Sequence, residues 1–568
     1  MSVSARPLGC YLTELLAAHG IDTIFGIPGV HNLELYRGLD RHRQLRHVLV
    51  RHEQGAGFAA DGYARSTGRP AAAFVISGPG VSNVLTAALQ AVSDSVPLIV
   101  IASTPVRRSL GRSWGMLHEL HDQQAIMAAG LDLTATAGSA TEARDFLNRV
   151  FAEYRAGRTR PAYLGVPLDV LAESTDLPVE TASLPSRAIA STQQLEQAVV
   201  LLNAAQRPLV IAGGGAREAA AALRALVEAT DAYLVTTAAG KGLLPESHPA
   251  NLGCSLPYAP TQQRIAEADV VLAVGTGLSE TDIYTGDRLT FGGQMIRIDL
   301  DPRPDERHPA AVTLCADAGV VLASLAQRCA PRQGWRSSSG SAALTRATID
   351  VAADAPTRRL RNVLNAIRAA LPADALVFSD MTQIAYLGNY AFACDQPRLW
   401  HHPSGYGTLG YALPAAIGAR VAYADRAVVA LAGDYGVQFT VQELGTAVEL
   451  GRSLPIIVWN NSALGQIRDD MIASGIAPIG VVGHNPDFVA LAQAWGARGE
   501  RVGDAAQLTA ALRAALPLHG ADAGVSPTPD QQAYLDHYGI HFAAELPGLS
   551  HEFGVVEAPG HRIATHLW

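Results

Sequence analysis

The chain has few of the features that mark disulfide-rich, nucleic-acid-binding or membrane proteins. Its five cysteines are scattered over 568 residues without CxxC spacing, which predicts reduced, mostly buried thiols rather than a disulfide framework or a zinc site. The net charge is −9 and no long basic run is present, so binding to nucleic acid or to a membrane surface gains no support. The longest apolar stretches, such as Val96–Ala102 and Val270–Val274, are far too short to span a bilayer. The N-terminal residues lack an apolar signal core, and we therefore expect a cytoplasmic protein.

What the chain does contain is an ordinary globular composition spread over several domains. Hydrophobic residues make up 48% and charged residues 17%, and about three or four domains are expected at this length. We expect a first domain over 1–180, a central domain over 191–335 and a third domain over 357–516. Between them, Leu177–Ser191 is rich in Pro, Ser and Thr, and Pro331–Ser341 carries a run of Ser and Gly. Both compositions are typical of linkers, and the second is typical of a flexible one.

Short apolar runs alternate with helical segments in all three domains. This alternation predicts an α/β fold of three doubly wound parallel sheets with helices on both faces, of which the central one is Rossmann-like. The clearest predicted strands are Ala71–Ile76, Pro97–Ala102, Leu209–Ala212, Val270–Val274 and Met295–Ile298.

Residues 517–568 depart from this alternation. After the predicted helix Ala505–Leu516, a doubly wound domain should close with one more apolar strand, but a segment rich in Pro, Gly and Ala follows instead. We therefore expect an atypical C-terminal tail, in which Phe553–Val556 and His561–Trp568 are candidates for a short hairpin. A divergent surface extension is equally compatible with the tolerance of chain termini to change.

Asp434 and Asn461 form the most informative pair of residues. Each follows an apolar run that predicts a buried strand, Ala427–Ala432 and Leu454–Val458, and the intervening Phe439–Leu450 predicts a helix. Such a β-α-β unit places both oxygen ligands at the carboxyl ends of neighbouring parallel strands, where open α/β sheets bind ligands. A hard divalent cation prefers such oxygen donors. A lone Gly-Asp is usually only a turn, but the spacing of 27 residues to the second Asn of a double Asn is far more specific.

At this spacing the segment resembles the cofactor motif of thiamine-diphosphate enzymes of the acetolactate synthase-like and 2-oxo acid decarboxylase family. The resemblance implies that Asp434, Asn461 and the carbonyl of Ala463 hold Mg²⁺, which anchors the diphosphate of the cofactor. Tyr435 is a departure, because the family usually has Gly or Ala there. A bulky ring beside the diphosphate is expected to weaken cofactor binding or to reshape the loop. Further contacts with the cofactor are implied for Thr382, Gln383, Gly433, Tyr435 and Gly436.

A second segment, Arg51–Arg65, places Glu53 at the start of a helix made mostly of small residues. A lone Glu at a helix start is usually a surface residue stabilised by the helix dipole. The surrounding Gly and Ala favour a desolvated position, which would raise the pKa of the carboxyl. The segment closely resembles the catalytic-glutamate helix of the same family. That resemblance implies that Glu53 donates a hydrogen bond to N1′ of the aminopyrimidine and favours the tautomer that removes the C2 proton of the cofactor.

A third segment, Ser404–Gly418, would ordinarily be only a glycine-rich loop leading into a helix. In the family this loop carries an apolar residue that holds the cofactor in a V shape, and here the resemblance assigns that role to Leu409. The carbonyl of Gly407 would accept a hydrogen bond from the 4′-amino group. Because Glu53 lies in the first domain and the other residues in the third, the resemblance implies a site built from two subunits, hence a homodimer or homotetramer. It extends over roughly 8–516.

The residues that select the substrate are less clear from the sequence. Val30 and His31 follow the Pro-Gly of the first loop, and His118 and Gln123 belong to a loop that often faces the thiazolium in the family. These residues are candidates for proton donation or carboxylate binding, although a lone His is more often structural. His402, just before the glycine-rich loop, is a weaker candidate.

Several segments together resemble one subgroup, 5-guanidino-2-oxopentanoate (2-ketoarginine) decarboxylase. This resemblance implies non-oxidative decarboxylation of a small 2-oxo acid, giving 4-guanidinobutanal and CO₂. A guanidinium prefers a carboxylate partner, and Asp469 or Asp470, just past the double Asn, would be that partner unless both are solvated helix residues. The segments are Gly26–Tyr36, His118–Leu120, Ser379–Tyr386, His402–Ile417 and Trp459–Met471.

Two other functions stay open at this point. Carboligation of 2-oxo acids, as in acetolactate synthase, uses the same residues, so motifs do not separate it from decarboxylation. Tyr435 and the unusual tail would also suit a chain that binds the cofactor without turnover. The glycines of Ala212–Ala216 and Gly275–Ser279 fit a Rossmann-like domain but are weak grounds for a nucleotide. The flavin motif of acetolactate synthases is not evident at Gly277–Thr285, and we expect no FAD.

Overall fold

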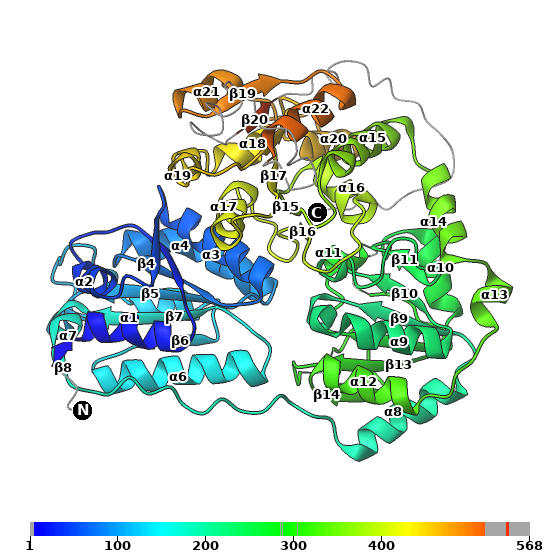
Figure 1. Ribbon diagram of the computed structural model, residues 1–568, viewed down its shortest axis with the longest axis horizontal. Helices are drawn as coiled ribbons and strands as arrows, with labels where there is room; N and C mark the ends of the chain where they lie inside the picture. The colour runs from blue at the N-terminus through cyan, green and yellow to red at the C-terminus, as the bar shows by residue number, and fades with distance from the viewer. Residues whose placement is uncertain (1–4, 285, 287, 304, 517–540, 545–568) are drawn as a thin grey trace, which may run out of the picture.

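A computed structural model describes residues 5–284, 286, 288–303, 305–516 and 541–544. Three six-stranded sheets dominate it, and their strands pair in parallel. Figure 1 shows the first domain in blue and cyan, the central domain in green and the third in yellow and orange, arranged around a common centre. The predicted α/β fold with three parallel sheets is confirmed.

The first sheet has the strand order β3-β2-β4-β5-β7-β6, with helices on both faces. A short antiparallel pair of strands, β1 (Arg6–Pro7) and β8 (Ser174–Thr175), joins the beginning of the first domain to its end. The six strands are β2 (Thr23–Gly26), β3 (Arg46–Leu49), β4 (Ala71–Val75), β5 (Leu98–Thr104), β6 (Leu133–Thr136) and β7 (Ala162–Pro167). The helices are α1 (Leu8–Ala18), α2 (Leu33–Arg41), α3 (Glu53–Thr67), α4 (Pro79–Ser93), α5 (Gln123–Ala128), α6 (Ala140–Ala156) and α7 (Leu168–Ala172).

The central sheet has the order β11-β10-β9-β12-β13-β14. Its strands are β9 (Pro208–Ala212), β10 (Tyr233–Thr236), β11 (Asn251–Gly253), β12 (Val270–Val274), β13 (Gln294–Asp299) and β14 (Val312–Cys315). Its helices are α8 (Thr192–Ala204), α9 (Ala220–Thr230), α10 (Ala259–Glu267), α11 (Glu280–Ile283) and α12 (Ala318–Arg328).

The third sheet has the order β16-β15-β17-β18-β20-β19. Its strands are β15 (Leu376–Ser379), β16 (Trp400–His401), β17 (Val428–Gly433), β18 (Ile456–Trp459), β19 (Arg498–Arg501) and β20 (His541–Ala544). Its helices are α15 (Ala355–Ala370), α16 (Gln383–Ala391), α17 (Ala412–Ala422), α18 (Asp434–Gln438), α19 (Glu443–Glu449), α20 (Gly465–Ala473), α21 (Phe488–Ala494) and α22 (Ala505–Ala515).

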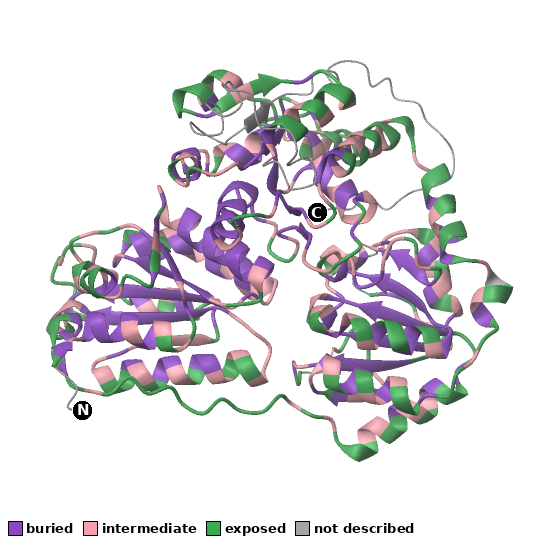
Figure 2. Cartoon of the chain, in the orientation of Figure 1, coloured by how far each residue is buried: buried purple, intermediate pink, exposed green. Residues whose placement is uncertain are grey.

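The cores lie where the continuous apolar runs predicted them. Every residue of β4, β5 and β12 is buried, as expected for parallel strands that are covered by helices on both faces. Figure 2 shows these strands in purple, with the exposed residues on the outer helices and connecting loops. Among the described residues, none of the helices has the length and apolar character that crossing a bilayer requires.

Three expectations from the sequence need correction. The segment Phe439–Leu450 is not one helix, because α18 ends at Gln438 and α19 begins at Glu443. Between them the Thr440 hydroxyl donates to the carbonyl of Gly410 at 2.8 Å, which holds the chain in a turn. The linker Pro331–Ser341 is not free chain. It contains the helix α13 (Trp335–Ser339), whose buried Trp335 ring packs against Tyr233 at a centroid distance of 4.8 Å. A further helix, α14 (Ala342–Val351), follows it.

The C-terminal tail also differs from its expected form, because four of its residues form a strand of the third sheet. The third sheet does have a closing strand, since β20 lies between β18 and β19 and pairs in parallel with both. Its four residues are separated from α22 by a segment whose composition gives no strand signal, and the sequence therefore did not indicate the pairing. The proposed hairpin of Phe553–Val556 and His561–Trp568 lies outside the described residues.

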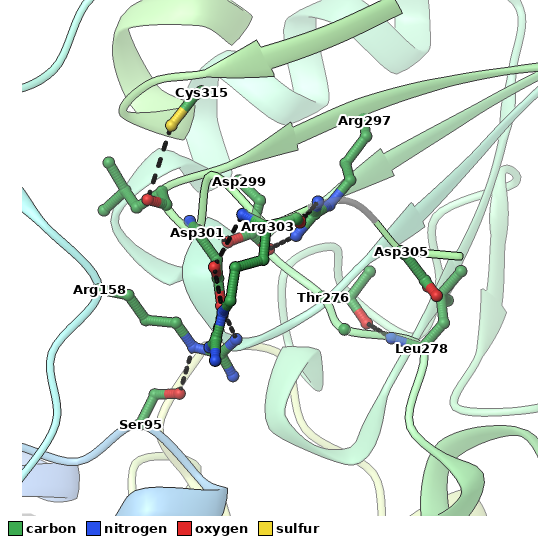
Figure 3. Close-up of polar contacts among 12 residues, drawn as sticks. Ser95, Arg158, Thr276, Leu278, Arg297, Asp299, Asp301, Arg303, Asp305 and Cys315 are labelled. Atoms are coloured by element: carbon green, nitrogen blue, oxygen red, sulfur yellow. Dashed lines mark hydrogen bonds and ion pairs between the residues drawn. The ribbon is translucent and has the colours of Figure 1, made fainter. Parts of the chain in front are cut away.

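Arg158 fastens the first domain to the central domain (Figure 3). Its guanidinium donates to the Ser95 hydroxyl at 2.7 Å and to the carboxylate of Asp301 at 3.3 Å. Arg303 donates to the same carboxylate, and this hydrogen bond holds the pKa of Asp301 well below its usual range. Asp301 is therefore charged at neutral pH and can bind both arginines.

Helices α3 and α17 join the first domain to the third by backbone-to-backbone packing. A Cβ atom added at Gly418 would lie 1.8 Å from the carbonyl oxygen of Ala59, and one added at Gly62 would lie 2.0 Å from that of Ala415. No side chain fits at either glycine unless the helices separate. The ring of Phe58 packs edge-on against Tyr411 beside this crossing.

We expect Gly418→Ala to lower the free energy of unfolding by about 2–3 kcal/mol, because the added methyl group forces the two helices apart. Urea unfolding of the full chain measures the change. Gly277→Ala is the matched control, since a Cβ atom there meets nothing within 4 Å. Equal stability of the two variants would contradict the close crossing.

Candidate active site

The carboxyl ends of β17 and β18 bring the two predicted metal ligands to one edge of the third sheet. Gly433, the last residue of β17, pairs with Trp459, the last residue of β18. Asp434 follows directly and begins α18, while Asn461 lies two residues after its strand. Asp434 is 3% exposed, so its carboxylate lies inside the sheet edge rather than on the surface.

Asn485 is the direct partner of Asp434. Its side-chain amide donates to the Asp434 carboxylate at 2.7 Å and to the Asn460 carbonyl oxygen at 3.1 Å. The amide oxygen of Asn485 accepts from Gln438 at 3.1 Å. Burial raises the pKa of Asp434, and the hydrogen bond from Asn485 opposes that shift. Sequence reasoning missed Asn485, which lies 51 residues further along the chain in a loop without a recognisable motif.

Several other predicted cofactor contacts gather at the same edge. The amide of Asn461 donates to the side-chain oxygen of Gln383 at 3.3 Å, and its own oxygen accepts from the backbone N–H of Ala463 at 3.2 Å. A Cβ atom at Gly433 would lie 3.0 Å from the Thr382 hydroxyl. Thr382 and Gln383, at the start of α16, therefore lie beside the ends of β17 and β18.

The donors at this edge fit a small, hard cation. The described residues contain no group of three or more His, Cys, Asp or Glu that could hold a metal. A metal at this edge would instead use the carboxylate of Asp434, the carboxamide of Asn461 and the peptide carbonyl of Ala463. Such oxygen donors suit Mg²⁺, which keeps waters and phosphate oxygens in its other positions.

The Tyr435 ring extends toward the loop that precedes α21. A Cβ atom at Gly483 would lie 2.5 Å from the Tyr435 hydroxyl, so the absence of a side chain at Gly483 makes room for the ring. The neighbouring Gly436 is equally constrained, since its Cβ atom would lie 2.9 Å from the carboxylate of Asp380.

Asp380 is a buried carboxyl that the sequence did not single out. It accepts from the backbone N–H of Gly410 at 2.9 Å and from that of Met381 at 2.8 Å. Burial raises its pKa to about 7. These bonds tie the start of α17 to the end of β15, and they fix one end of the glycine-rich loop 404–410, where Gly407 and Gly410 have positive φ angles of 68° and 81°.

Glu53 begins α3, as predicted, and it is half-buried. Its carboxylate accepts from the side-chain amide of Asn83 on α4 at 3.0 Å. Within the described chain, the hydrogen bond of Glu53 stays in the first domain and none joins it to Asp434 or Asn461. Among the described residues of one chain, Glu53 is therefore not joined to the two predicted metal ligands by a hydrogen bond.

Glu443 supports the backbone that leads into Glu53. Its fully buried carboxyl accepts from the N–H groups of Arg51 and His52, each at 3.0 Å. Gly55 leaves the necessary space, because a Cβ atom there would lie 2.3 Å from the carboxyl oxygen of Glu443. Burial raises the pKa of Glu443 to about 7.

Two of the predicted substrate residues lie side by side. The His31 and His118 rings have centroids 4.9 Å apart, and Nδ1 of His31 lies 2.6 Å from the Ser77 hydroxyl. Burial, followed by the charge of His118, lowers the pKa of His31. In the described part of the chain, Nδ1 of His118 is buried without a hydrogen-bond partner. Val30 is 67% exposed.

Gln123 lies against the loop that contains Ser77 and Gly78, and both its side-chain oxygen and its side-chain nitrogen form hydrogen bonds. Its oxygen accepts from the N–H of Gly78 at 2.9 Å, and its amide donates to the carbonyl of Ser103 and the hydroxyl of Tyr163. The side chain is 7% exposed. Its contacts fix the loop rather than leave a free group for a ligand.

The two candidate carboxylates on α20 have different surroundings. Asp469 is exposed and accepts from Arg468 at 3.0 Å and from Gln383 at 3.1 Å. Asp470 accepts from Gln466 at 3.1 Å through Oδ1 only. Its Oδ2 atom is buried and has no hydrogen-bond partner among the described residues. A buried carboxylate oxygen without a partner is costly, so Asp470 has capacity for a further donor.

His402 is another buried polar residue, and it lies just before the glycine-rich loop. Its Nδ1 lies 2.9 Å from the Ser379 hydroxyl, and burial lowers its pKa to about 4. Its Nε2 atom has no hydrogen-bond partner among the residues that are described. The imidazole is therefore neutral at neutral pH.

The glycines of the central domain have a packing explanation. A Cβ atom at Gly213 would lie 2.5 Å from the carbonyl oxygen of Gly275, and one at Gly275 would lie 2.5 Å from Cα of Gly215. The two glycine loops therefore pack directly on each other at the ends of β9 and β12.

The oxygen donors, the glycine-rich loop and the helix-initiating glutamate thus lie on separate α/β domains, as the resemblance to thiamine-diphosphate enzymes predicts. Three family descriptions match the chain: the N-terminal TPP binding domain of thiamine pyrophosphate enzymes over 7–126, their central domain over 195–325 and their C-terminal TPP binding domain over 380–525. The chain belongs to the thiamine pyrophosphate enzyme family.

Two kinds of relative are similar over most of the chain. A probable 2-ketoarginine decarboxylase, AruI, from Pseudomonas aeruginosa is 49% identical over 90% of this chain and 92% of its own length. The acetolactate synthase isozyme 1 large subunit of Escherichia coli is 30% identical over 81% of this chain and 82% of its own. The acetolactate synthase large subunit of Parasynechococcus marenigrum is 31% identical over 91% and 85%, respectively. The chain is thus a thiamine-diphosphate-dependent enzyme of the decarboxylase or acetolactate synthase type.

We expect Glu443→Gln to change how stability depends on pH. The folded state holds this proton to a pKa of about 7, whereas the ordinary value is 4.5. The unfolded chain therefore releases the proton first, and the contribution of Glu443 to stability falls by on the order of 3 kcal/mol as the pH rises between these two values. The glutamine variant lacks this fall. Urea unfolding at pH 5 and pH 7.5 tests it, and parallel profiles for the two proteins would refute the expectation.

Proposed function

We propose that the chain catalyses the thiamine-diphosphate- and Mg²⁺-dependent, non-oxidative decarboxylation of 5-guanidino-2-oxopentanoate to 4-guanidinobutanal and CO₂. The observation that carries this proposal is the 49% identity, over 90% of the chain, to a relative named as a probable 2-ketoarginine decarboxylase. The buried, unpartnered oxygen of Asp470 supports it independently among the described residues, because a guanidinium forms charge-assisted hydrogen bonds with a carboxylate.

When bound, thiamine diphosphate supplies a carbon nucleophile and an electron sink for the loss of CO₂. In the proposal Asp434, Asn461 and the carbonyl of Ala463 hold the Mg²⁺. Thr382, Gln383, Gly433 and the backbone amides of Tyr435 and Gly436 hold the diphosphate. Gly407 and Leu409 orient the aminopyrimidine. We further propose that these residues act from a third domain over 357–516, next to domains over 1–180 and 191–335.

Glu53 is the proposed acid that holds a proton toward the aminopyrimidine. The hydrogen bond that Asn83 donates restricts its carboxylate, and Glu443 fixes the backbone just before it by accepting from the N–H groups of Arg51 and His52. A group that moves a proton must keep a fixed direction toward its partner. Both contacts serve that requirement.

His31 and His118 are the proposed source of the proton that completes the aldehyde. The rings lie close together, and burial lowers the pKa of His31, so a protonated His31 would release its proton readily. Ser77 orients His31. Gln123 acts indirectly, by holding the backbone at Gly78. Val30, which is exposed, is proposed to contact the substrate.

Asp470 rather than Asp469 is the proposed partner of the substrate guanidinium. Asp469 already accepts from Arg468 and Gln383, whereas one oxygen of Asp470 is unsatisfied in the described chain. A positive side chain would remove the cost of burying that oxygen. A neutral 2-oxo acid of equal length would not.

Carboligation of 2-oxo acids is the second candidate function. The identities of 30% and 31% to acetolactate synthases over more than four-fifths of the chain favour it. It shares every residue named above up to the loss of CO₂, so only the product separates the two reactions. Decarboxylation yields an aldehyde, and carboligation yields a 2-hydroxy-2-alkyl-3-oxo acid.

A homodimer or homotetramer is also proposed, because Glu53 lies in a different domain from Asp434 and Asn461, and no hydrogen bond joins it to them among the described residues of one chain. Large apolar side chains are exposed near both halves. In the first domain Trp114 is 57% and Leu117 60% exposed, and after α20 Ile479 is 74% and Val482 68% exposed. A second copy of the chain that covered these residues would bring Glu53 to the cofactor of its partner.

We expect CO₂ release to be fastest from the guanidino acid in a panel that includes pyruvate, branched and aromatic 2-oxo acids. Asp470→Asn should lower kcat/KM for the guanidino acid about 10- to 100-fold and leave the neutral acids nearly unchanged, because only the cation needs the charge. A coupled assay of CO₂ with chromatography of the products measures both. Asp469→Asn is the matched control and should change the preference little.

In the same panel Glu53→Gln should lower CO₂ release at least about 100-fold from every acid. A guanidino preference that survives Asp470→Asn would refute the assigned recognition. CO₂ release without aldehyde, accompanied by a ligated product, would favour the second function. Cofactor binding without CO₂ from any acid would point to a chain that does not turn over.

The proposed shared site predicts complementation between two inactive variants. Glu53→Gln and Asp434→Asn inactivate different halves of the site, so mixed dimers contain one site with both changes and one intact site. Random mixing after mild dissociation should restore about a quarter of the wild-type activity. Activity that stays at the level of the separate variants, despite exchange of labelled subunits, would show that each chain builds its own site.

A further inference from the structure

The glycine-rich loop 404–410 of the third domain is held by two side chains of the first domain. The carboxylate of Asp94 accepts from the backbone N–H of Gly405 at 2.9 Å. The side-chain oxygen of Gln90 accepts from the Thr408 hydroxyl at 2.9 Å and from the Thr408 N–H at 3.3 Å. Both side chains come from the C-terminal end of α4.

The orientation of these acceptors is fixed by a buried network. The amide of Gln90 donates to Asp94 at 2.7 Å, and Arg65 donates to the same carboxylate at 2.7 Å. Arg65 also donates to Asp61 at 2.6 Å. Gln90 is fully buried and Arg65 is 5% exposed. Since the nitrogen of Gln90 faces a carboxylate, its oxygen must face Thr408.

The bonds fall on the part of the loop where position matters most. Gly407 has a φ of 68°, which glycine adopts readily, and its lack of a Cβ atom would leave the backbone here free to take other conformations. The clamped residues, Gly405 and Thr408, lie on either side of it, and Leu409 follows directly. An acceptor on each side of Gly407 therefore sets both its carbonyl and the direction of the Leu409 side chain.

We propose that Gln90 and Asp94 are positioning residues that pre-organise the cofactor loop. The proposal rests on the roles proposed for Gly407 and Leu409. Through Thr408 and Gly405, the two side chains hold the loop in the shape that binds and bends the cofactor before the cofactor arrives. Binding of the cofactor then does not have to supply the free energy that orders the loop. This favours both cofactor affinity and deprotonation at C2.

The test compares Thr408→Val, which removes the hydroxyl but keeps the shape, with Thr408→Ser, which keeps the hydroxyl. In the full-length apoprotein, Thr408→Val should weaken thiamine diphosphate binding about five- to tenfold, because the buried oxygen of Gln90 loses its better donor. It should also slow hydrogen–deuterium exchange at C2 of the bound cofactor by a similar factor. Thr408→Ser should restore both within about twofold. Calorimetry with thiamine diphosphate and Mg²⁺, quenched-exchange NMR and the thermal midpoint of the apoprotein are the readouts.

A purely structural role would lower the thermal midpoint of both variants without separating them in affinity or C2 exchange, and that result would overturn the proposal. Wild-type affinity and exchange in Thr408→Val would overturn it as well. If Thr408→Val does not fold, amide exchange of wild-type apoprotein decides. The peptide 404–410 should be protected about as well as α17, and exchange as fast as in exposed loops would exclude a clamp.

These measurements do not involve a substrate, so they are independent of the proposed guanidino acid. If the wild-type chain did not bind thiamine diphosphate, the proposed cofactor site would be refuted. Protection of the 404–410 amides would still report on the clamp in that case.

Discussion

The whole arrangement depends on the crossing of α3 and α17, where one backbone lies directly against another. Gly62 and Gly418 permit this contact, since a Cβ atom at either would overlap a carbonyl of the opposite helix. The crossing determines how the first and third domains face each other in one chain. The Glu443 bonds to the start of α3 and the Asp94 bond to the glycine-rich loop form only because the two helices are this close. The small-residue composition of α3, which in the sequence suggests desolvation of Glu53, thus serves interdomain packing as well.

The sequence predicts much of the third domain's site because its information there is local. Asp434 and Asn461 each follow an apolar run, and the order of parallel strands then brings the two residues to one edge. Continuous apolar runs likewise predict the buried strands of all three sheets. The helix 439–450 is predicted wrongly because helical residues flank a turn that is stabilised by a distant partner, the carbonyl of Gly410.

The supporting residues could not be predicted in this way. Glu443 and Arg51 are 392 residues apart, and Gln90 and Thr408 are 318 residues apart. Each is an ordinary polar residue in its own segment, and its role arises only from the packing of two domains. The distinction between Asp469 and Asp470 has the same origin: adjacent residues of one helix point to different neighbours, and only one finds a full set of partners. The strand β20 was missed because pairing with β18 and β19, rather than its own pattern, defines it.

Helix α4 has contacts of different kinds at its two ends. Asn83, near its start, holds Glu53, and Gln90, near its end, holds the loop with Gly407 and Leu409. In a dimer with shared sites, these two ends serve different catalytic centres. A single rigid helix is then a common part of both, and a substitution within it cannot be confined to one of them. Its sequence is under two sets of geometric demands at once, so changes at one end have to preserve the other.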